Sequence, residues 1–548
     1  MTGRSTAERW AVVRGLAQRA ANARGRPAAG WYREERGVAY QLQAFAGVVD
    51  EAGLAGALAQ QDRQRPLMEK LWGYYRNPLA PTRVSTLAGQ AGGRWYSQAQ
   101  ESSLPARFGP RPVEGLMEPR AVREAVVEND IGWRVQAMVD FVFGKPVLIR
   151  SSAKEQATRE VIEKVLDALW EQSGGIALLQ DFATLGHVYG HVDLVLRMDD
   201  AALVEAGERL RGSEPAVALD AILAAVDAMR VEVVEPTRGA AVLHERDYRD
   251  IKAYVIRAGV DRTHGGTSSG FAGWLGDVAR AVVGARSAQT HRESGELLEI
   301  ISGHAWHVYD DGELVWQSTL GLTDGQVPVA HVQNISQPFV YTGVSEVEPL
   351  IPLQDELNAR LSDRAHRVTM QSFKMYLAKG VEGFEKVPVG PGQVWYTDNM
   401  SASVEAFGGD ASSPSENEHI REIREAMDKV SGVPPLSGGV VQGRIGNLTS
   451  ANALRITLMG LLAKTQRKRV AYGRAMARIC ELALTALHNA GVLATSASDR
   501  GVVLHWPDPL PEDEEAKVRA AESKLKLGVP SERVLGELGY GSGDAGVA

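Results

Sequence analysis

The sequence has a single cysteine, Cys480, among its 548 residues. An intrachain disulfide and a zinc site built from several thiolates are therefore excluded. Long hydrophobic runs are also missing, because none reaches the roughly 20 apolar residues that a membrane-spanning helix needs. The N-terminal stretch is basic but has neither the apolar core nor the small-residue cleavage site of a signal peptide. We therefore expect a soluble protein that stays in the compartment where it was made.

An excess of positive charge is absent as well. The chain has 60 basic and 68 acidic residues, which gives a formal net charge of −8. This balance excludes a generally cationic nucleic-acid binder but allows a local basic surface. The composition, with 44% hydrophobic residues, 57 Gly and 24 Pro, excludes wholesale disorder and collagen-like repeats. The length predicts about three or four structural units.

Recognisable catalytic motifs are lacking. No phosphate-binding loop, no dinucleotide-binding glycine pattern and no Gly-x-Ser-x-Gly elbow is found. Cys480 lies on an apolar helical face and is interpreted as a small buried hydrophobic residue. The acidic pairs Glu346/Glu348 and Glu416/Glu418 are interpreted as solvated helix starts, where negative charge complements the helix dipole. The sequence thus predicts a protein that is not an enzyme.

One constellation resembles a metal site. His187 and His191 have the i, i+4 spacing that places two ligands on one helical face, and Asp193 could supply a third. Gly186 and Gly190 argue against a regular helix here, which favours structural histidines at a corner between a helix and a strand. A metal-dependent hydrolase is kept as the alternative function.

The pattern of segments predicts an α+β fold that is mainly helical. Strand-like sequence is concentrated before residue 320, with a hairpin predicted over 297–320 whose turn is Asp310-Asp311-Gly312. Residues 200–228 form an Ala-rich helical insertion, and the Gly- and Ser-rich residues 261–292 are the best candidate for a linker.

Later segments are helical and unusually extended. A helical run covers 346–378, and a glycine-rich loop at 434–450 precedes the proline-free residues 451–491. As one helix, that last stretch is about 60 Å long, which favours an elongated subunit inside an assembly. It is also basic: between 451 and 490 seven basic residues, Arg455, Lys464, Arg467, Lys468, Arg469, Arg474 and Arg478, stand against Glu481 alone. They indicate a solvated face, intersubunit salt bridges to the acidic residues 416–428, or contacts with nucleic-acid phosphates.

Several segments, taken in order, are similar to one known family. The strongest likeness lies between residues 325 and 355, in GQVPV (325–329), Asn334 and GVSEVEPLIPLQD (343–355). Shorter matches are WGYYRN (72–77), Asn129, VD (139–140), FGKP (143–146), VVEP (233–236), SGVPP (431–435), TSANAL (449–454) and WPDPLP (506–511). Together they resemble the portal protein, or head-to-tail connector, of tailed double-stranded-DNA bacteriophages of the siphophage type. Ser450 departs from the glycine that is common at that place in the family.

This resemblance implies a ring, normally of twelve subunits, at one capsid vertex of the virion, through which DNA is packaged and ejected. The expected partners are other copies of the chain, the large terminase subunit, the head-tail adaptor, the major capsid and scaffolding proteins, and double-stranded DNA bound without sequence preference. Membrane binding and cofactors are not expected, and host cytoplasm is the expected location during assembly. Another structural virion protein is a further alternative.

The resemblance also divides the chain. It implies a wing (1–340, with insertions at 200–228 and 261–292), a first stem helix (341–380), a clip (381–415), a second stem helix (416–433), a tunnel loop (434–450), a tunnel helix (451–491) and a C-terminal wing segment with a small crown (492–548). The candidate DNA-facing loop residues are Gln442, Arg444 and Asn447. Weaker candidates on the tunnel helix are Lys464, Arg467 and Lys468. No catalytic residue and no metal ligand is assigned.

Overall fold

The computed structural model describes residues 40–76, 126–211, 215–261, 294–319, 321–372, 375–379, 399–407, 414–435, 455–510, 514–531 and 534. The chain divides into two compact units. Unit 1 comprises residues 1–68, 135–346 and 433–548, and unit 2 comprises 69–134 and 347–432. Unit 2 is therefore inserted twice into the sequence of unit 1. Mixed helices and strands in both units confirm the predicted α+β class.

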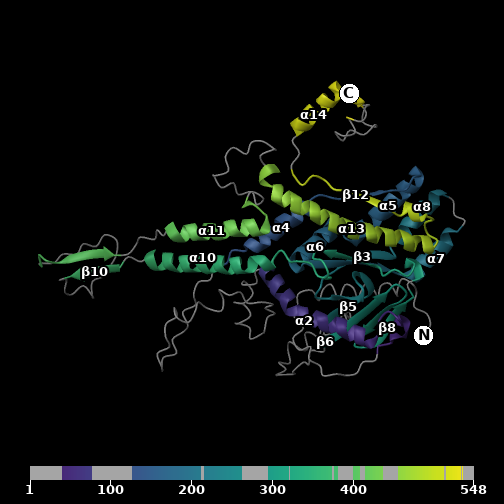
Figure 1. Ribbon diagram of the computed structural model, residues 1–548, viewed down its shortest axis with the longest axis horizontal. Helices are drawn as coiled ribbons and strands as arrows, with labels where there is room; N and C mark the ends of the chain where they lie inside the picture. The colour runs from purple at the N-terminus through teal and green to yellow at the C-terminus, as the bar shows by residue number, and fades with distance from the viewer. Residues whose placement is uncertain are drawn as a thin grey trace, which may run out of the picture. The chain divides into compact units, whose positions relative to one another are not determined.

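Unit 1 holds most of the secondary structure (Figure 1). The helices α2 and α4 each belong partly to unit 1 and partly to unit 2. The elements, in chain order, are η1 (Leu42–Phe45), α2 (Glu51–Arg76), α4 (Asp130–Phe143), β1 (Leu148–Ser151), α5 (Gln156–Ser173), α6 (Gly175–Tyr189), β2 (His191–Met198), α7 (Asp200–Leu210), α8 (Pro215–Val226), β3 (Met229–Val234), β4 (Gly239–His244), β5 (Asp247–Asp261), β6 (Ser294–Ser302), β7 (Trp306–Asp310), β8 (Glu313–Ser318), η5 (Gly321–Thr323), β9 (Val329–Gln333), α13 (Met459–Asn489), η9 (Ala497–Asp499), β12 (Val502–His505) and α14 (Glu514–Lys526).

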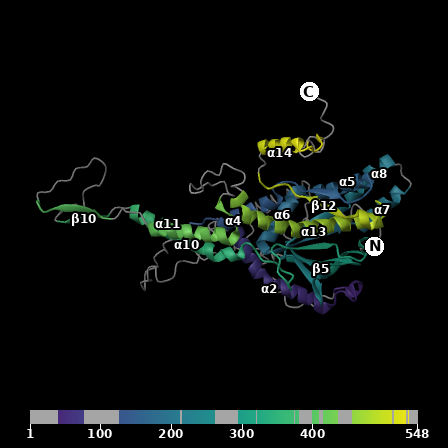
Figure 2. The same ribbon diagram turned by 45° about the horizontal axis from the view of Figure 1, so that its top comes forward.

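A three-stranded antiparallel sheet, in the order β3-β2-β9, lies at the centre of unit 1. All eight residues of β2 are buried, because helices cover the sheet: α5 packs on β3, α6 on β2, and α13 on β2 and β9. Both ribbon views show α13 running beside α6 and β12 (Figures 1 and 2). The apolar run of β2 is thus explained by burial of both strand faces.

A second, five-stranded antiparallel sheet has the order β4-β5-β6-β7-β8. Its core packs Val255, Ile300 and Tyr309 against Phe45 and Leu54 from the N-terminal helices. The hairpin predicted within 297–320 is β7–β8, and its turn at Asp311 and Gly312 has φ of 50° and 86°. Two successive positive φ angles are typical of the type I′ turn, whose twist matches that of the two strands it joins. The predicted helical insertion at 200–228 is the pair α7 and α8.

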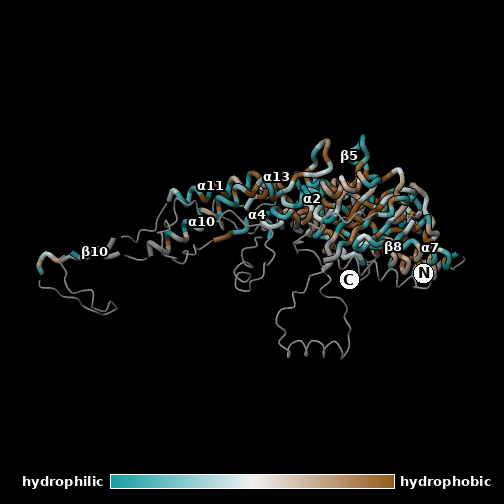
Figure 3. Tube along the Cα trace, turned by 90° about the horizontal axis from the view of Figure 1, so that it is seen from below, coloured by the Kyte–Doolittle hydropathy of each residue, from teal (hydrophilic) through white to brown (hydrophobic). Residues whose placement is uncertain are grey.

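Unit 2 contains η6 (Glu348–Leu350), α10 (Ile351–Ser372), β10 (Met375–Lys379), β11 (Ser403–Phe407) and α11 (Pro414–Ser431). The helices α10 and α11 lie side by side and antiparallel, and β10 pairs with β11 in an antiparallel ladder (Figures 1 and 2). Ile420, Ile423 and Met427 form the buried stripe of α11, and the tube coloured by hydropathy alternates along this helix accordingly (Figure 3).

The predicted helix over 346–378 is shorter in the structure. Helix α10 begins after the 3₁₀ turn that contains Pro349 and ends at Ser372. Residues 375–379 form a strand instead, because their backbone groups find partners in β11. Residues 262–293, which include nearly all of the predicted linker, lie outside the described residues. No helix among the described residues is long and apolar enough to cross a membrane.

Candidate functional site

The predicted DNA-facing residues Gln442, Arg444 and Asn447 lie outside the described residues, so their contacts stay a prediction. The element that follows them, α13, is described and carries the basic pattern that the sequence singles out. At 31 residues it is about 46 Å long. The structure separates the basic residues of this helix into two groups. Some form ion pairs or hydrogen bonds within unit 1, and others have no such partner among the described residues.

The buried face of α13 is anchored by an aromatic contact. The ring of Tyr472 lies between Phe143 and Phe182, with centroid distances of 5.9 and 4.9 Å. Its hydroxyl donates to Oδ1 of Asn334 at 3.3 Å. A Cβ on Gly186 would stand 2.0 Å from this hydroxyl oxygen, so only glycine fits there. Gly186 therefore allows α13 to pack closely on α6, and our expectation that it interrupts the helix is wrong, whereas Gly190, with φ of 88°, does end α6.

Lys464 and Lys468, two of the predicted DNA contacts, bind one carboxylate. Their ammonium nitrogens lie 2.5 and 2.6 Å from the two oxygens of Glu346. The side chains of Lys468 and Glu346 are only 2% and 3% exposed. Our interpretation of Glu346 as a solvated helix start is therefore wrong, whereas Glu348 is exposed as expected. Both lysines have a structural role, and their contact with DNA stays a prediction.

The electrostatics of this cluster follow from its burial. Burial by itself would raise the pKa of Glu346, but the charges of Lys468 and Lys464 outweigh it and lower this pKa to about 2. Burial lowers the pKa of Lys468 to about 8, against the opposing attraction of Glu346. Glu346 and Lys468 are therefore both ionised at neutral pH, and they form an ion pair in a nearly dry environment.

Two further basic residues at this end of unit 1 are engaged within it. Arg469 donates to the backbone oxygen of Phe141 at 3.1 Å, and its guanidinium lies 5.2 Å from the ring centroid of Trp506. Arg455 forms an ion pair of 2.7 Å with Asp508. These contacts attach the start of α13 to neighbouring segments and remove both cations from the set available to a ligand.

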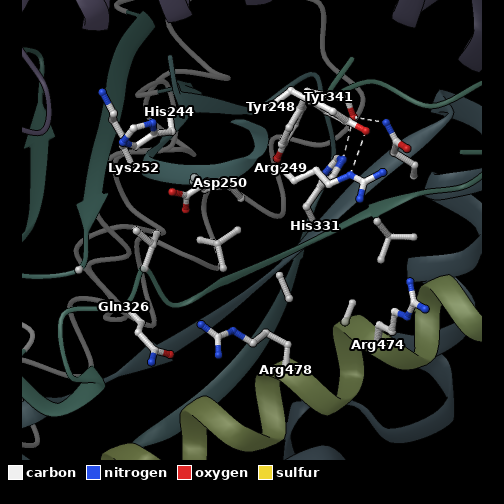
Figure 4. Close-up of a pocket in the computed structure, with 18 of the residues that line it drawn as sticks. His244, Tyr248, Arg249, Asp250, Lys252, Gln326, His331, Tyr341, Arg474 and Arg478 are labelled. Atoms are coloured by element: carbon white, nitrogen blue, oxygen red, sulfur yellow. Dashed lines mark hydrogen bonds between the residues drawn. The ribbon is translucent and has the colours of Figure 1, made fainter. Parts of the chain in front are cut away.

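The remaining arginines of α13 line a cleft. Arg467, Arg474 and Arg478 are spaced by seven and four residues, which places them on one side of the helix. They border a pocket of about 900 Å³. Figure 4 shows Arg474 and Arg478 extending from α13 into this space. Arg478 pairs with Glu481 at 2.9 Å, while within the described part of the chain no partner is found for Arg467 or Arg474.

The opposite wall is also basic. Arg249 and Lys252, from the start of β5, also line the pocket, on the side away from α13 (Figure 4). Asp250 is the only acidic residue in this lining. We call the space bounded by Arg249, Lys252, Arg467, Arg474 and Arg478 the basic cleft. It is a local reversal of charge in a chain whose net charge is −8.

A buried carboxylate holds one edge of the basic cleft together. Asp193 accepts hydrogen bonds from the hydroxyls of Tyr254 (2.7 Å) and Tyr341 (2.9 Å) and from Nδ1 of His331 (2.7 Å). Nε2 of His331 lies 2.8 Å from the backbone oxygen of Tyr341, and the two rings stack at 3.7 Å. Burial would raise the pKa of Asp193, but His331 and the hydrogen bonds lower it. The network links β2, β5 and the segment after β9.

The residues of the metal-site alternative do not form a metal site. Asp193 is occupied by this network, and His187 donates from Nδ1 to the backbone oxygen of Ala183 at 2.6 Å. Burial holds the pKa of His187 well below its usual value and lowers that of His191 to about 4. Within the described ranges, no group of three or more His, Cys, Asp or Glu side chains could hold a metal ion. We therefore do not pursue the hydrolase alternative.

The interpretation of Cys480 is confirmed. It is fully buried, receives a hydrogen bond from Nε1 of Trp170 at 3.4 Å, and has a pKa that burial raises to about 12. A thiol in this state is unreactive. Sequence reasoning missed Glu346 and Asp193 as organising carboxylates. A signal was present for Asp193, because a charged residue within the apolar run of β2 requires a partner.

Comparison with known proteins gives a family for nearly the whole chain. Residues 58–538 match the family described as phage portal protein, SPP1 Gp6-like. Matches among solved structures include the virion of a native gene transfer agent particle, at 14% identity and a TM-score of 0.39. The neck of the native particle, computed with C12 symmetry, matches at 14% identity and a TM-score of 0.38. Each match covers 75% of this chain and 89% of the other.

No curated protein matches the chain. The family match extends from within α2 to residues beyond α14, and so includes both units, the long helix and the basic cleft. It agrees with the resemblance of the segments between 72 and 511 and with the α+β architecture. The chain therefore belongs to the SPP1 Gp6-like family of phage portal proteins.

Proposed function

We propose that this protein assembles into a closed ring of about twelve copies at one capsid vertex and forms the channel for DNA packaging and ejection. The observation that carries the proposal is the family match over residues 58–538. The elongated α13 and a unit 2 made of a helical pair with a strand hairpin are consistent with it. The subunit acts by geometry rather than by catalysis, and ATP hydrolysis belongs to a separate packaging motor.

The tunnel loop supplies the contact with DNA in this proposal. Its sequence has four glycines between 438 and 446, which permit backbone conformations that follow a moving duplex. A single Arg444 per subunit becomes a ring of like charges when the ring closes. Sparse positive rings in an acidic protein attract phosphates weakly at physiological salt, so the duplex is held yet slides. Gln442 and Asn447 complete the proposed contact set.

The other partners are assigned to different segments. The clip (381–415), which includes β11, would contact the large terminase subunit during packaging and the head-tail adaptor afterwards, together with β10, the strand with which β11 pairs. The wing in unit 1 would contact the capsid and scaffolding proteins. In this scheme the protein assembles in the host cytoplasm and remains in the virion.

The ring is tested by the mass of the purified protein in solution. Light scattering should give a particle of about twelve subunits, and negative-stain images should show a central hole. A monomer or dimer that persists at high concentration and in the presence of the scaffolding protein would contradict the proposal.

The loop contact is tested by Arg444→Glu. Reversing this charge replaces an attractive ring by a repulsive one, so we expect an unchanged ring mass but less DNA packaged in an assay with terminase and ATP. Lys154→Glu, at an exposed position of unit 1, is the matched control and should package normally. Equal packaging by both variants would remove Arg444 from the DNA path.

A further inference from the structure

Five basic residues line the basic cleft, and several of them are exposed to solvent. Arg467 and Arg474 on one wall and Arg249 on the other are exposed, and Lys252 is half-buried. Like charges gathered around one pocket repel one another, and an anionic group that enters the pocket offsets this repulsion. Because the other basic residues of α13 bind Glu346, Glu481 or a backbone oxygen, Arg467 and Arg474, which have no partner among the described residues, define where such a group would bind.

The surroundings of the basic cleft favour a polypeptide over a nucleic acid. Val340 and Val470 line it and are 39% and 54% exposed. The adjacent Phe339 is 86% exposed and has φ of 67°, which is a strained conformation for a bulky residue. Exposed aromatic and aliphatic side chains beside arginines are typical of protein interfaces. A pocket of about 900 Å³ is also too small to admit a DNA duplex.

The chain itself contains a surface of matching character. Residues 200–228 carry six acidic residues and only two basic ones. On α7, Glu205 and Glu208 are exposed beside Val204, which is 42% exposed, so acidic and apolar groups lie together. Glu205 also pairs with the exposed Arg209 one turn further along the helix, and this solvated pair would exchange for the arginines of the cleft. We call Val204, Glu205 and Glu208 the acidic face of α7. Its exposed glutamates and valine complement the exposed arginines and apolar residues of the basic cleft.

We propose that the basic cleft of one subunit binds the acidic face of α7 of the next copy of this chain. This inference rests on the proposed ring, because a cyclic assembly of more than two copies needs two different, complementary patches on each subunit. The cleft and the acidic face supply such a pair within unit 1. The interaction is electrostatic at its rim and apolar around Phe339, so it weakens with added salt without disappearing.

The test is a charge reversal with reciprocal rescue. The double variant Arg467→Glu/Arg474→Glu should raise the protein concentration needed for ring formation at least about tenfold, as measured by sedimentation velocity, because like charges then face each other. Adding Glu205→Arg/Glu208→Arg to the same chain should restore assembly. Arg63→Glu/Arg230→Glu, which reverses two exposed arginines elsewhere in unit 1, is the matched control. Arg467→Gln/Arg474→Gln should show a smaller defect in the same direction.

Each outcome of this test either supports or overturns the proposed contact between neighbouring subunits. Unchanged assembly of the double reversal, or a defect that the reciprocal change does not relieve, would overturn this inference while leaving the ring intact. Normal assembly with loss of binding to a labelled 20-base-pair duplex would assign the cleft to nucleic acid and also overturn it. A wild-type protein that forms no ring would overturn the proposed function itself. Circular dichroism of each variant establishes that the subunits compared are folded.

Discussion

At the scale of single residues, Glu346 organises the buried charges of unit 1 near the start of α13. Its carboxylate balances Lys464 and Lys468 where the chain leaves unit 1 for unit 2. The sequence shows it only as one of two nearby acidic residues, and nothing in its spacing distinguishes it from the exposed Glu348. The distinction arises because α13, more than a hundred residues later, brings two lysines to it. Long-range pairing of this kind is not visible in one sequence.

Glu346→Gln should destabilise unit 1 strongly. It leaves the buried ammonium group of Lys468 without its countercharge, and breaking a buried ion pair in this way costs about 3–5 kcal/mol. The free energy of unfolding is measured in urea. Glu481→Gln is the control, because its pair with Arg478 is solvent-exposed and such pairs contribute less than about 1 kcal/mol. Equal losses in the two variants would show that the cluster around Glu346 is dispensable.

Acid should destabilise the fold in two steps. The pKa of His191 is about 4 in the fold and 6.5 in the unfolded chain, so the unfolded chain binds more protons between these values. Stability is therefore complete above pH 6.5 and falls by about 3 kcal/mol towards pH 4. The second step belongs to Glu346, whose pKa is lowered from 4.5 to about 2 in the fold. Its contribution to stability is lost as the pH falls from 4.5 through 2.

Urea unfolding at a series of pH values checks both steps. His191→Gln should flatten the upper step, leaving the share that belongs to His187, whose pKa is also lowered. The lower step should persist in this variant and become smaller in Glu346→Gln, where the rest belongs to Glu232 and Asp193, whose pKa values are also lowered. An upper step of the same size in His191→Gln would contradict the assignment.

At the scale of elements, the local sequence predicts a helix or a turn correctly where its pattern agrees with the burial found in the fold. The β7–β8 turn and the helices at 200–228 were predicted because turn residues and alanine content act locally. The end of α10 was not predicted correctly. The helical sequence pattern continues past Ser372, but the pairing of β10 with β11 overrides it. Of the predicted site, Lys464 and Lys468 lie on α13 as expected, but their partner could be found only from the fold.

Replacing glycine by alanine should have opposite effects on stability at Gly207 and at Gly460. A Cβ on Gly207 of α7 would stand 1.8 Å from the backbone oxygen of Ala490, just after α13, whereas one on Gly460 meets nothing within 4 Å. Gly207→Ala should therefore cost about 1–3 kcal/mol by forcing the two segments apart. Gly460→Ala should stabilise α13 by roughly 0.5–1 kcal/mol, because alanine favours a helix. Urea midpoints of the two variants should move in opposite directions, and a shared direction would contradict the packing described.

At the scale of the whole molecule, the division into two units predicts that part of unit 2 is removable. Met375 and Phe407 are paired residues at the base of the β10–β11 hairpin, so their backbones are about 5 Å apart and a short linker can join them. Replacing residues 375–407 with four glycines should preserve ring formation and abolish binding of the large terminase subunit. Light scattering and a pull-down with terminase measure the two properties. Retained terminase binding would place the docking surface elsewhere.

The pairing of β1 with β12 has a consequence for synthesis. Ser152, just after β1, bonds to Gly501, which lies 349 residues later in the chain. A ribosome therefore completes α4, β1 and α5 long before the strand and the helix α13 that cover them exist, although protein domains otherwise tend to fold in the order of their synthesis. A subunit that is interrupted before residue 502 lacks the partner of β1, and one that is interrupted before residue 467 also lacks the three α13 arginines of the basic cleft. If the proposed ring forms through this cleft, a truncated chain would be unable to join it, and defective products would be excluded without a separate inspection step.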